Sequence, residues 1–107
     1  MSTAAKLILK PFDKDALNTR QKENYNFHKA AGVLADYGFH SMRLTDDWEG
    51  ADFIAVHVDG EQFLKVQLKG KMAFAKKYKG KNIYICFPLG SDWWLYDHDL
   101  LFKEVTK

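Results

Sequence analysis

The sequence predicts a domain of the α/β (α+β) class, with a mixed central sheet flanked by helices. Three observations predict it: a helical period of apolar residues early in the chain, several short runs rich in β-branched and aromatic residues after it, and an Asp-Gly turn signal between two of these runs. The chain has 107 residues and 47% hydrophobic content, which suits one compact domain covering residues 1–107. Residues 1–15 are expected to form an arm, in which LILKPF (residues 7–12) fits a short edge strand.

The expected order of elements is α-β-β-β-loop-β-β-α, and it begins with a long helix. This helix is expected from about Asn18 to Tyr37, because Asn18 or Thr19 can cap its start and Gly38 follows as a stop. One face of the helix would carry Glu23, Phe27, Ala30, Ala31 and Leu34.

Three strands are expected after the helix. The first covers Phe39–Leu44, where FHSMRL alternates, and the polar TDDWEG segment (residues 45–50) is expected to be a turn or loop. The next two strands meet at Asp59-Gly60, which signals a two-residue type I′ turn, because both of its residues need positive φ. The lysine-rich residues 70–81 that follow form a loop with at most one helical turn.

The last part of the chain predicts two more strands and a short helix. NIYICF (residues 82–87) is expected to be a buried strand and WWLY (residues 93–96) the strand after it. The two tryptophans of WWLY alternate faces, so one is expected to pack in the core and the other to be exposed. An exposed tryptophan can stack on a base or a partner, but a partly buried aromatic of the sheet is the favoured interpretation. Asp97 or Asp99 can cap the final helix.

The composition excludes several kinds of site. The lone Cys86 excludes an internal disulfide and a Cys-rich zinc site, and its apolar surroundings suit a small buried hydrophobe. The histidines show no metal-ligand spacing. The sequence has no apolar stretch of about 18 residues, so no membrane span is expected, and a cytoplasmic location is the default.

The Asp-Gly turn sets the register of the hairpin that surrounds it. Counting outward from a two-residue turn places Asp52 directly opposite Gln67, with Cβ atoms about 4.5–5.5 Å apart. Lys69 lies two residues beyond Gln67 and therefore projects on the same face, whereas His57 lies on the opposite face and is expected to be structural. The purely structural alternative is an Asp–Lys salt bridge at a strand end, worth about 0–1 kcal/mol when exposed.

The residues after Gln67 are strongly basic, although the formal net charge of the chain is only +2. Such a run is either a solvated surface or a phosphate-binding patch. The candidates for DNA binding are Lys71, Lys76, Lys77, Lys79 and Lys81, which follow Lys69 with almost no acidic residues between them.

The segment GADFIA (residues 50–55), followed by VQLK (residues 66–69), resembles the signature of the PD-(D/E)XK nuclease superfamily. It is most similar to small Holliday-junction-resolvase-like and homing-endonuclease-like members, some of which carry VQVK where most carry VEVK. The resemblance covers roughly residues 18–96. It implies a restriction-endonuclease-like core, DNA as the partner and Mg²⁺-dependent endonucleolytic hydrolysis of DNA, with branched DNA as one candidate substrate and Mn²⁺ as a possible substitute ion.

The resemblance also implies roles for individual residues. The metal-binding aspartate of the motif falls on Asp52, its glutamate position on Gln67 and its catalytic lysine on Lys69. The helix glutamate found in many members is best matched by Glu23, although the usual spacing to the glycine would place it at Phe27. Mg²⁺ prefers oxygen ligands, so the Gln67 amide and the backbone carbonyl of Leu68 would complete the protein's share of the site.

The glutamine is a departure from the motif. Gln67 removes one negative charge from the site, which should weaken metal binding and favour one ion over two. It also leaves open a second class of function, a catalytically silent module that binds nucleic acid or a protein. Asp47 is a reserve metal ligand, and a homodimer is expected because so small a nuclease has little surface with which to hold a duplex.

Overall fold

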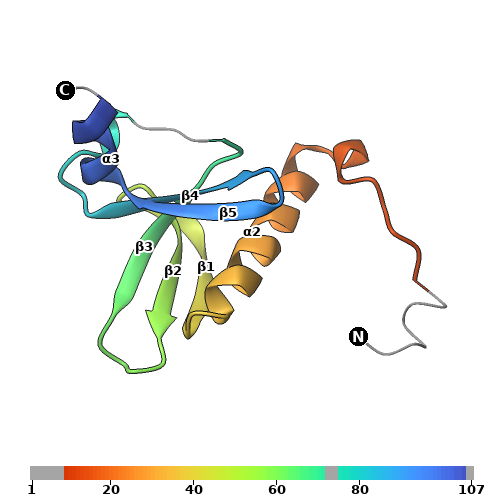
Figure 1. Cartoon of the computed structure of the whole chain (residues 1–107), viewed down its shortest axis with the longest axis horizontal. Helices are drawn as coiled ribbons and strands as arrows, with labels where there is room; N and C mark the ends of the chain where they lie inside the picture. The colour runs from red at the N-terminus through yellow and green to blue at the C-terminus, as the bar shows by residue number, and fades with distance from the viewer. Residues whose placement is uncertain (1–8, 72–74, 106–107) are drawn as a thin grey trace.

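The computed structural model of the protein describes residues 9–71 and 75–105. Within these residues it confirms the predicted class and the predicted order of elements, with helices flanking a five-stranded mixed sheet (Figure 1). The elements in chain order are η1 (Lys14–Ala16), α2 (Thr19–Ala35), β1 (Phe39–Trp48), β2 (Ala51–His57), β3 (Phe63–Leu68), η2 (Lys76–Tyr78), β4 (Ile83–Leu89), β5 (Asp92–Asp97) and α3 (His98–Val105).

The strands follow one another across the sheet in the order β1-β2-β3-β4-β5. Neighbouring strands are antiparallel except β3 and β4, which are parallel. Two parallel neighbours need a crossover connection of about a dozen residues or more. Residues 69–82, here called the crossover segment, make this connection, so the basic part of the chain leaves β3 directly after Gln67 and Leu68.

Helix α2 packs on one face of the sheet (Figure 1). A capping box fixes its start: the Asn18 side chain accepts the N–H of Gln21, and the Gln21 side chain accepts the N–H of Asn18, both at 2.9 Å. The ring of Phe27 meets that of Phe53 edge-on, with centroids 5.1 Å apart. Burial in this layer raises the pKa of the Cys86 thiol to about 11. The buried residues of the layer are Phe27, Ala30, Leu34, Phe53, Ala55, Val66 and Cys86.

The opposite face of the sheet carries a second apolar cluster. Tyr78 of η2 belongs to it, so η2 packs over this face. Helix α3 begins directly after β5, and Asp97 caps it by accepting the N–H groups of Asp99 at 3.0 Å and Leu100 at 3.3 Å. The second cluster consists of Ala51, Tyr78, Ile83, Ile85 and Phe87.

No helix within residues 9–71 and 75–105 has both the length and the apolar character that crossing a membrane requires.

Two predictions of local structure are wrong. Residues 45–48, expected in a loop, continue β1 as far as Trp48, which pairs with Ala51 of β2. The register shifts between Arg43 and Trp48, and this irregularity accommodates the polar residues within the strand. Residues 9–12 belong to no strand, and the apolar side chains of Leu9 and Phe12 are exposed; the rest of the expected edge strand lies outside the described residues.

The turn between β2 and β3 differs from the prediction, but the register does not. Of the two turn residues, Gly60 has positive φ, at 75°, and Asp59 does not, so Asp59-Gly60 does not form the expected type I′ turn. The Asp59 carboxylate instead accepts the N–H groups of Glu61 at 2.8 Å and Gln62 at 3.1 Å, which holds its pKa well below the usual range. The N–H of His57 then donates to the Gln62 carbonyl at 2.9 Å, and this bond restores the predicted register.

His98 joins α3 to the crossover segment and is completely buried. Its Nε2 accepts the N–H of Ala75 at 3.0 Å, so the neutral ring carries its proton on Nδ1 and donates it to the Asp99 carboxylate at 3.1 Å. This hydrogen bond is the main cause of the lowered pKa of Asp99, whose carboxylate also accepts the N–H of Gly80 at 3.0 Å. The two side chains therefore hold both ends of residues 75–80 against α3.

Replacing His98 by Phe keeps a ring in this position and leaves the Ala75 N–H without its acceptor. We expect the free energy of unfolding to fall by about 1–3 kcal/mol, the cost of an unpaired buried donor. Urea unfolding followed by far-UV circular dichroism measures it. Phe102, whose ring centroid lies 5.7 Å from that of His98, gives the control: Phe102→Leu removes a ring contact, keeps these hydrogen bonds and should cost less. A His98→Phe protein as stable as the parent would contradict the role of this histidine.

Candidate functional site

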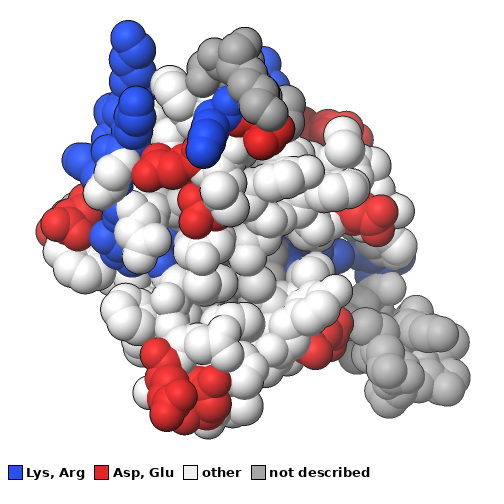
Figure 2. All heavy atoms as spheres, turned by 60° about the vertical axis from the view of Figure 1, so that its left-hand side comes forward, with Lys and Arg blue, Asp and Glu red and all other residues white. Residues whose placement is uncertain are grey.

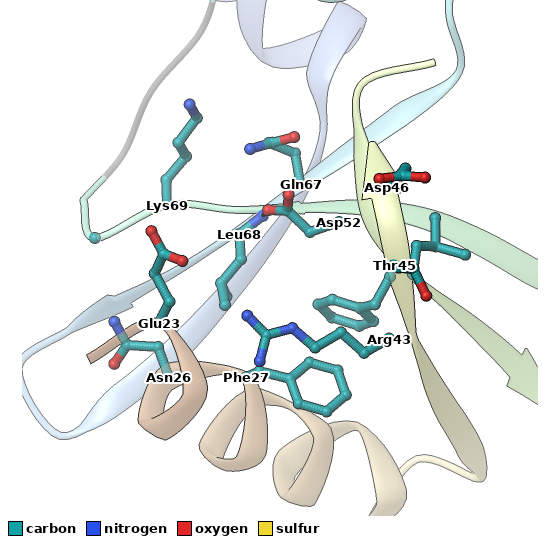
Figure 3. Close-up of a pocket in the computed structure, with 13 residues that line it drawn as sticks. Glu23, Asn26, Phe27, Arg43, Thr45, Asp46, Asp52, Gln67, Leu68 and Lys69 are labelled. Atoms are coloured by element: carbon teal, nitrogen blue, oxygen red, sulfur yellow. Dashed lines mark hydrogen bonds between the residues drawn. The ribbon is translucent and has the colours of Figure 1, made fainter. Parts of the chain in front are cut away.

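The site begins where the β2–β3 ladder ends. Phe53 pairs with Val66, and hydrogen-bonded positions alternate along the ladder from the His57–Gln62 bond. Asp52 and Gln67 are the next position outward in this register. They fall at a non-hydrogen-bonded position, where facing side chains lie closest. The predicted register is therefore confirmed, and Figure 3 shows the two side chains next to each other.

At the end of the β2–β3 ladder, the Asp52 carboxylate accepts a hydrogen bond that a backbone carbonyl would otherwise accept. Its Oδ2 accepts the N–H of Leu68 at 2.8 Å (Figure 3), while Ala51 turns to pair with Trp48 of β1. In a strand, the N–H and C=O of one residue point to the same neighbour. The Leu68 carbonyl is therefore directed toward the side on which Asp52 lies, as the predicted ligand set requires.

A cavity of about 460 Å³, here called the helix-side cavity, opens between α2 and this end of the sheet. Asp52, Gln67 and Lys69 line it together with Glu23 from α2 (Figure 3). Phe27, the other helix position that the resemblance allows, lies one turn further along and forms part of the wall. The structure thus brings all four predicted catalytic residues to one cavity, and Glu23 is the helix position that carries a carboxylate.

Sequence reasoning missed two charged residues of the helix-side cavity, Asp46 and Arg43. Asp46 falls in the segment expected to be a loop, and the side chain of the reserve ligand Asp47 lies outside the part of the chain that the structure describes. The Arg43 guanidinium contacts the Asn24 side chain and lies 5.5 Å from the centre of the Phe27 ring. Arg43 already lies within the expected strand, and recognising that β1 continues beyond Leu44 would have placed Asp46 at this end of the sheet.

A second hollow of about 240 Å³, here called the lysine-side cavity, shares three residues with the first: Asp52, Gln67 and Lys69. Lys77 and Lys81 of the crossover segment complete its basic lining. Its other lining residues are Gly50 and Tyr78.

The Tyr78 ring organises the lysine-side cavity. The ammonium groups of Lys69 and Lys77 lie 5.5 Å and 5.1 Å from the ring centre, within the range of a cation–π contact. At Gly50, φ is 90° and an added Cβ would lie 3.0 Å from Tyr78 Cδ1. Glycine therefore lets the turn before β2 approach this ring closely.

The other candidate lysines lie elsewhere. Lys71 lines a separate groove on β4 and β5, and Lys79 lies 5.6 Å from the centre of the Phe102 ring beside α3. Lys76 lies exposed at the start of η2. In Figure 2, many Lys and Arg side chains gather at the upper left of the face, with acidic side chains among them, and a separate acidic patch lies at the lower edge.

The prediction for the two tryptophans of β5 is confirmed. Trp93 packs against the α2 layer, and Trp94 is exposed. His57 lines neither cavity; its ring packs edge-on against Phe39, with centroids 5.0 Å apart, as a structural residue would.

The oxygen atoms at the site suit a cation with few protein ligands. Among the described residues, no three His, Cys, Asp or Glu side chains come close enough together to hold a metal ion. Asp52 accepts the N–H of Leu68, and because a carboxylate has about four acceptor positions, this hydrogen bond by itself does not prevent coordination. Asp52 with the Gln67 amide thus fits Mg²⁺, which keeps several waters and takes phosphate oxygens as ligands, and does not fit an all-protein cage.

Comparison of the chain with models of protein families, with curated proteins and with solved structures gives no match. The resemblance to nucleases therefore rests on the short motif and on the geometry around Asp52, Gln67 and Lys69.

The Asp52–Leu68 hydrogen bond predicts how substitutions at Asp52 affect folding. Asp52→Ala removes the acceptor of a partly buried N–H and should lower the free energy of unfolding by about 1–3 kcal/mol. Asp52→Asn keeps an acceptor oxygen and should cost less. Urea unfolding of both variants measures the difference, and equal stability of the two would contradict a structural role for this bond. Asp52→Asn is therefore the better variant for tests of activity.

Proposed function

We propose that the protein is a metal-dependent endodeoxyribonuclease that hydrolyses DNA phosphodiester bonds. The observation that carries this proposal is the convergence of Asp52, Gln67 and Lys69 at the open end of one hairpin, between two cavities. Glu23 supplies a further carboxylate from the far wall of the helix-side cavity. The motif implies such an arrangement, and the β2–β3 register supports it.

Each residue has a chemical task in this proposal. Asp52, the Gln67 amide oxygen and the Leu68 carbonyl would hold one divalent cation, Mg²⁺ or Mn²⁺. Such a cation lowers the pKa of a bound water and neutralises charge on the phosphate. Lys69 orients the attacking water and stabilises the charge that develops on the phosphate. The basic lining of the lysine-side cavity attracts the DNA backbone.

A second function is favoured by one specific observation, the neutral Gln67 at a position where the motif has an acid. With one carboxylate and one amide as side-chain ligands, metal affinity depends strongly on the substrate phosphate. The alternative is therefore a catalytically silent module that binds nucleic acid or a protein through the same surface. Cleavage assays separate the two functions.

Lys69→Ala and Asp52→Asn should each lower Mg²⁺-dependent DNA cleavage by about 100-fold or more, because they remove groups that act on the reacting phosphate. Labelled branched, single-stranded and duplex DNA, resolved on gels, provide the measurement. Lys65→Ala is the matched control, since Lys65 lies on β3, shortly before Lys69 in the chain, but pairs with Glu49 at 3.1 Å and lines neither cavity. Cleavage by Lys69→Ala at the parent's rate would refute the site, and a parent that cuts no DNA with Mg²⁺ or Mn²⁺ would favour the silent module.

Gln67→Glu restores the acid of the motif. It should strengthen Mn²⁺ binding, measured by calorimetry, because a charged oxygen replaces a neutral one next to Asp52. Unchanged Mn²⁺ affinity would show that residue 67 is not a metal ligand.

The positions of the lysines predict which of them contribute to DNA binding. The double variant Lys77→Ala, Lys81→Ala should bind duplex DNA with a weaker salt dependence. The slope of log K against log salt should become shallower by about 1–2, because each phosphate contact contributes about 0.9 to it. Lys76→Ala with Lys79→Ala removes the same charge outside the lysine-side cavity and should change the slope less. Fluorescence anisotropy at several salt concentrations measures both. Equal slopes for the two double variants would mean that net charge, and not the cavity, attracts DNA.

A further inference from the structure

Three aromatic rings form a parallel stack on β4 and β5. The Phe87 and Tyr96 rings lie 6.0 Å apart at an interplanar angle of 10°, and the Tyr96 and Trp94 rings lie 6.1 Å apart at 6°. Phe87 is buried, Tyr96 is half-buried and Trp94 is 42% exposed. The exposed indole therefore has a fixed orientation, because rings that belong to the core support it.

The stack forms part of the wall of a groove of about 380 Å³. Pro88 and the exposed Leu89 extend its apolar surface, and Lys71 adds a positive charge. A flat apolar surface beside a cation matches a ligand that has a planar ring and an adjacent negative group. A nucleotide has both, since its base stacks on aromatic side chains and its phosphate pairs with lysine.

The groove lies on the same face of the sheet as the candidate site. Gln67 of β3 pairs with Ile85 of β4, and Ile85 pairs with Tyr96 of β5, so the three residues form one row across the sheet. Side chains of paired residues project on the same face. Trp94 pairs with Phe87, which follows Cys86, the partner of Leu68, so Trp94 is two strands from Lys69, or about 10 Å at the usual spacing of strands. Successive bases of a DNA strand rise by about 3.4 Å, so this distance corresponds to about three base steps or fewer in a stretched strand.

We propose that Trp94 stacks on an unpaired base of a DNA strand whose phosphate occupies the site formed by Asp52, Gln67 and Lys69. This rests on the proposed nucleic-acid function and specifies its substrate. Bases inside a duplex are covered by their neighbours on both faces, so only an unpaired base offers its face to the indole. The substrate class is therefore single-stranded DNA, or the unpaired segment of a branched DNA, and Lys71 contacts the phosphate beside the stacked base.

Binding to single strands tests the proposal without cleavage. The probes are a fluorescent thymidine oligonucleotide and an oligomer of the same length that carries abasic sugars throughout, titrated in EDTA by anisotropy. For the parent, loss of the bases should weaken binding by about 5- to 150-fold, the range for stacking of one base on an aromatic side chain. Trp94→Ala should bind the thymidine oligomer more weakly by a similar factor and the abasic oligomer as the parent does. Trp94→Phe should retain most of the affinity.

Tyr37→Ala is the matched control, because Tyr37 is an exposed aromatic residue that follows α2 and lines neither the groove nor the candidate site. It should bind both oligomers as the parent does. Parent affinities that are equal for the two oligomers, a parent that binds neither, or a Trp94→Ala protein that equals the parent would each overturn the proposal. The abasic comparison uses the unaltered protein, so it holds even if Trp94→Ala folds poorly. If binding depends on the bases and on Trp94 but no DNA is cleaved, the stacking proposal stands and the nuclease activity is refuted. A failure of the stacking proposal can therefore be told apart from a failure of the proposed nuclease function.

Discussion

The register between β2 and β3 is the constraint on which the rest of the structure depends. Phe53 and Val66 are completely buried under α2, so their neighbours Asp52 and Gln67 must project from the other face of the sheet or from its end. A slip of the register by one residue would bury the polar side chains of β3 and expose the apolar ones that pack under α2. The stability of the apolar layer and the placement of the candidate site are therefore determined by the same pairing.

The crossover between β3 and β4 links this register to the basic residues. Because β3 and β4 are parallel, the chain must leave the sheet at Leu68 and return beside the start of β3, where Ile83 pairs with Lys65. The connection packs through Tyr78 and is held to α3 by His98. Two of its lysines consequently lie beside the candidate site, although the chain as a whole carries little net charge.

The sequence was informative where short-range periodicity decides the structure. Period-two alternation and the position of the turn were sufficient to predict that Asp52 faces Gln67, even though the Asp59 carboxylate, and not a type I′ turn, closes the loop. Longer-range features were not predictable in this way. Asp46 reaches the helix-side cavity because β1 continues through an irregular register, and the lysines separate because of contacts with Tyr78 and Phe102 that only the folded chain creates.

The charges around Asp52 form a gradient that bears on the order of binding. On one side, the helix-side cavity adds the carboxylates of Glu23 and Asp46 and the guanidinium of Arg43, which leaves an excess of negative charge; on the other, the lysine-side cavity adds the ammonium groups of Lys77 and Lys81. A phosphate is attracted from the lysine side, while a cation is favoured on the acidic side and opposed by the lysines. With a neutral Gln67 between them, a bound phosphate supplies the negative charge that the protein lacks, so DNA and metal should each raise the affinity for the other. Under the proposed function, the glutamine therefore makes metal binding depend on substrate, and the site assembles fully only when a DNA strand is in place.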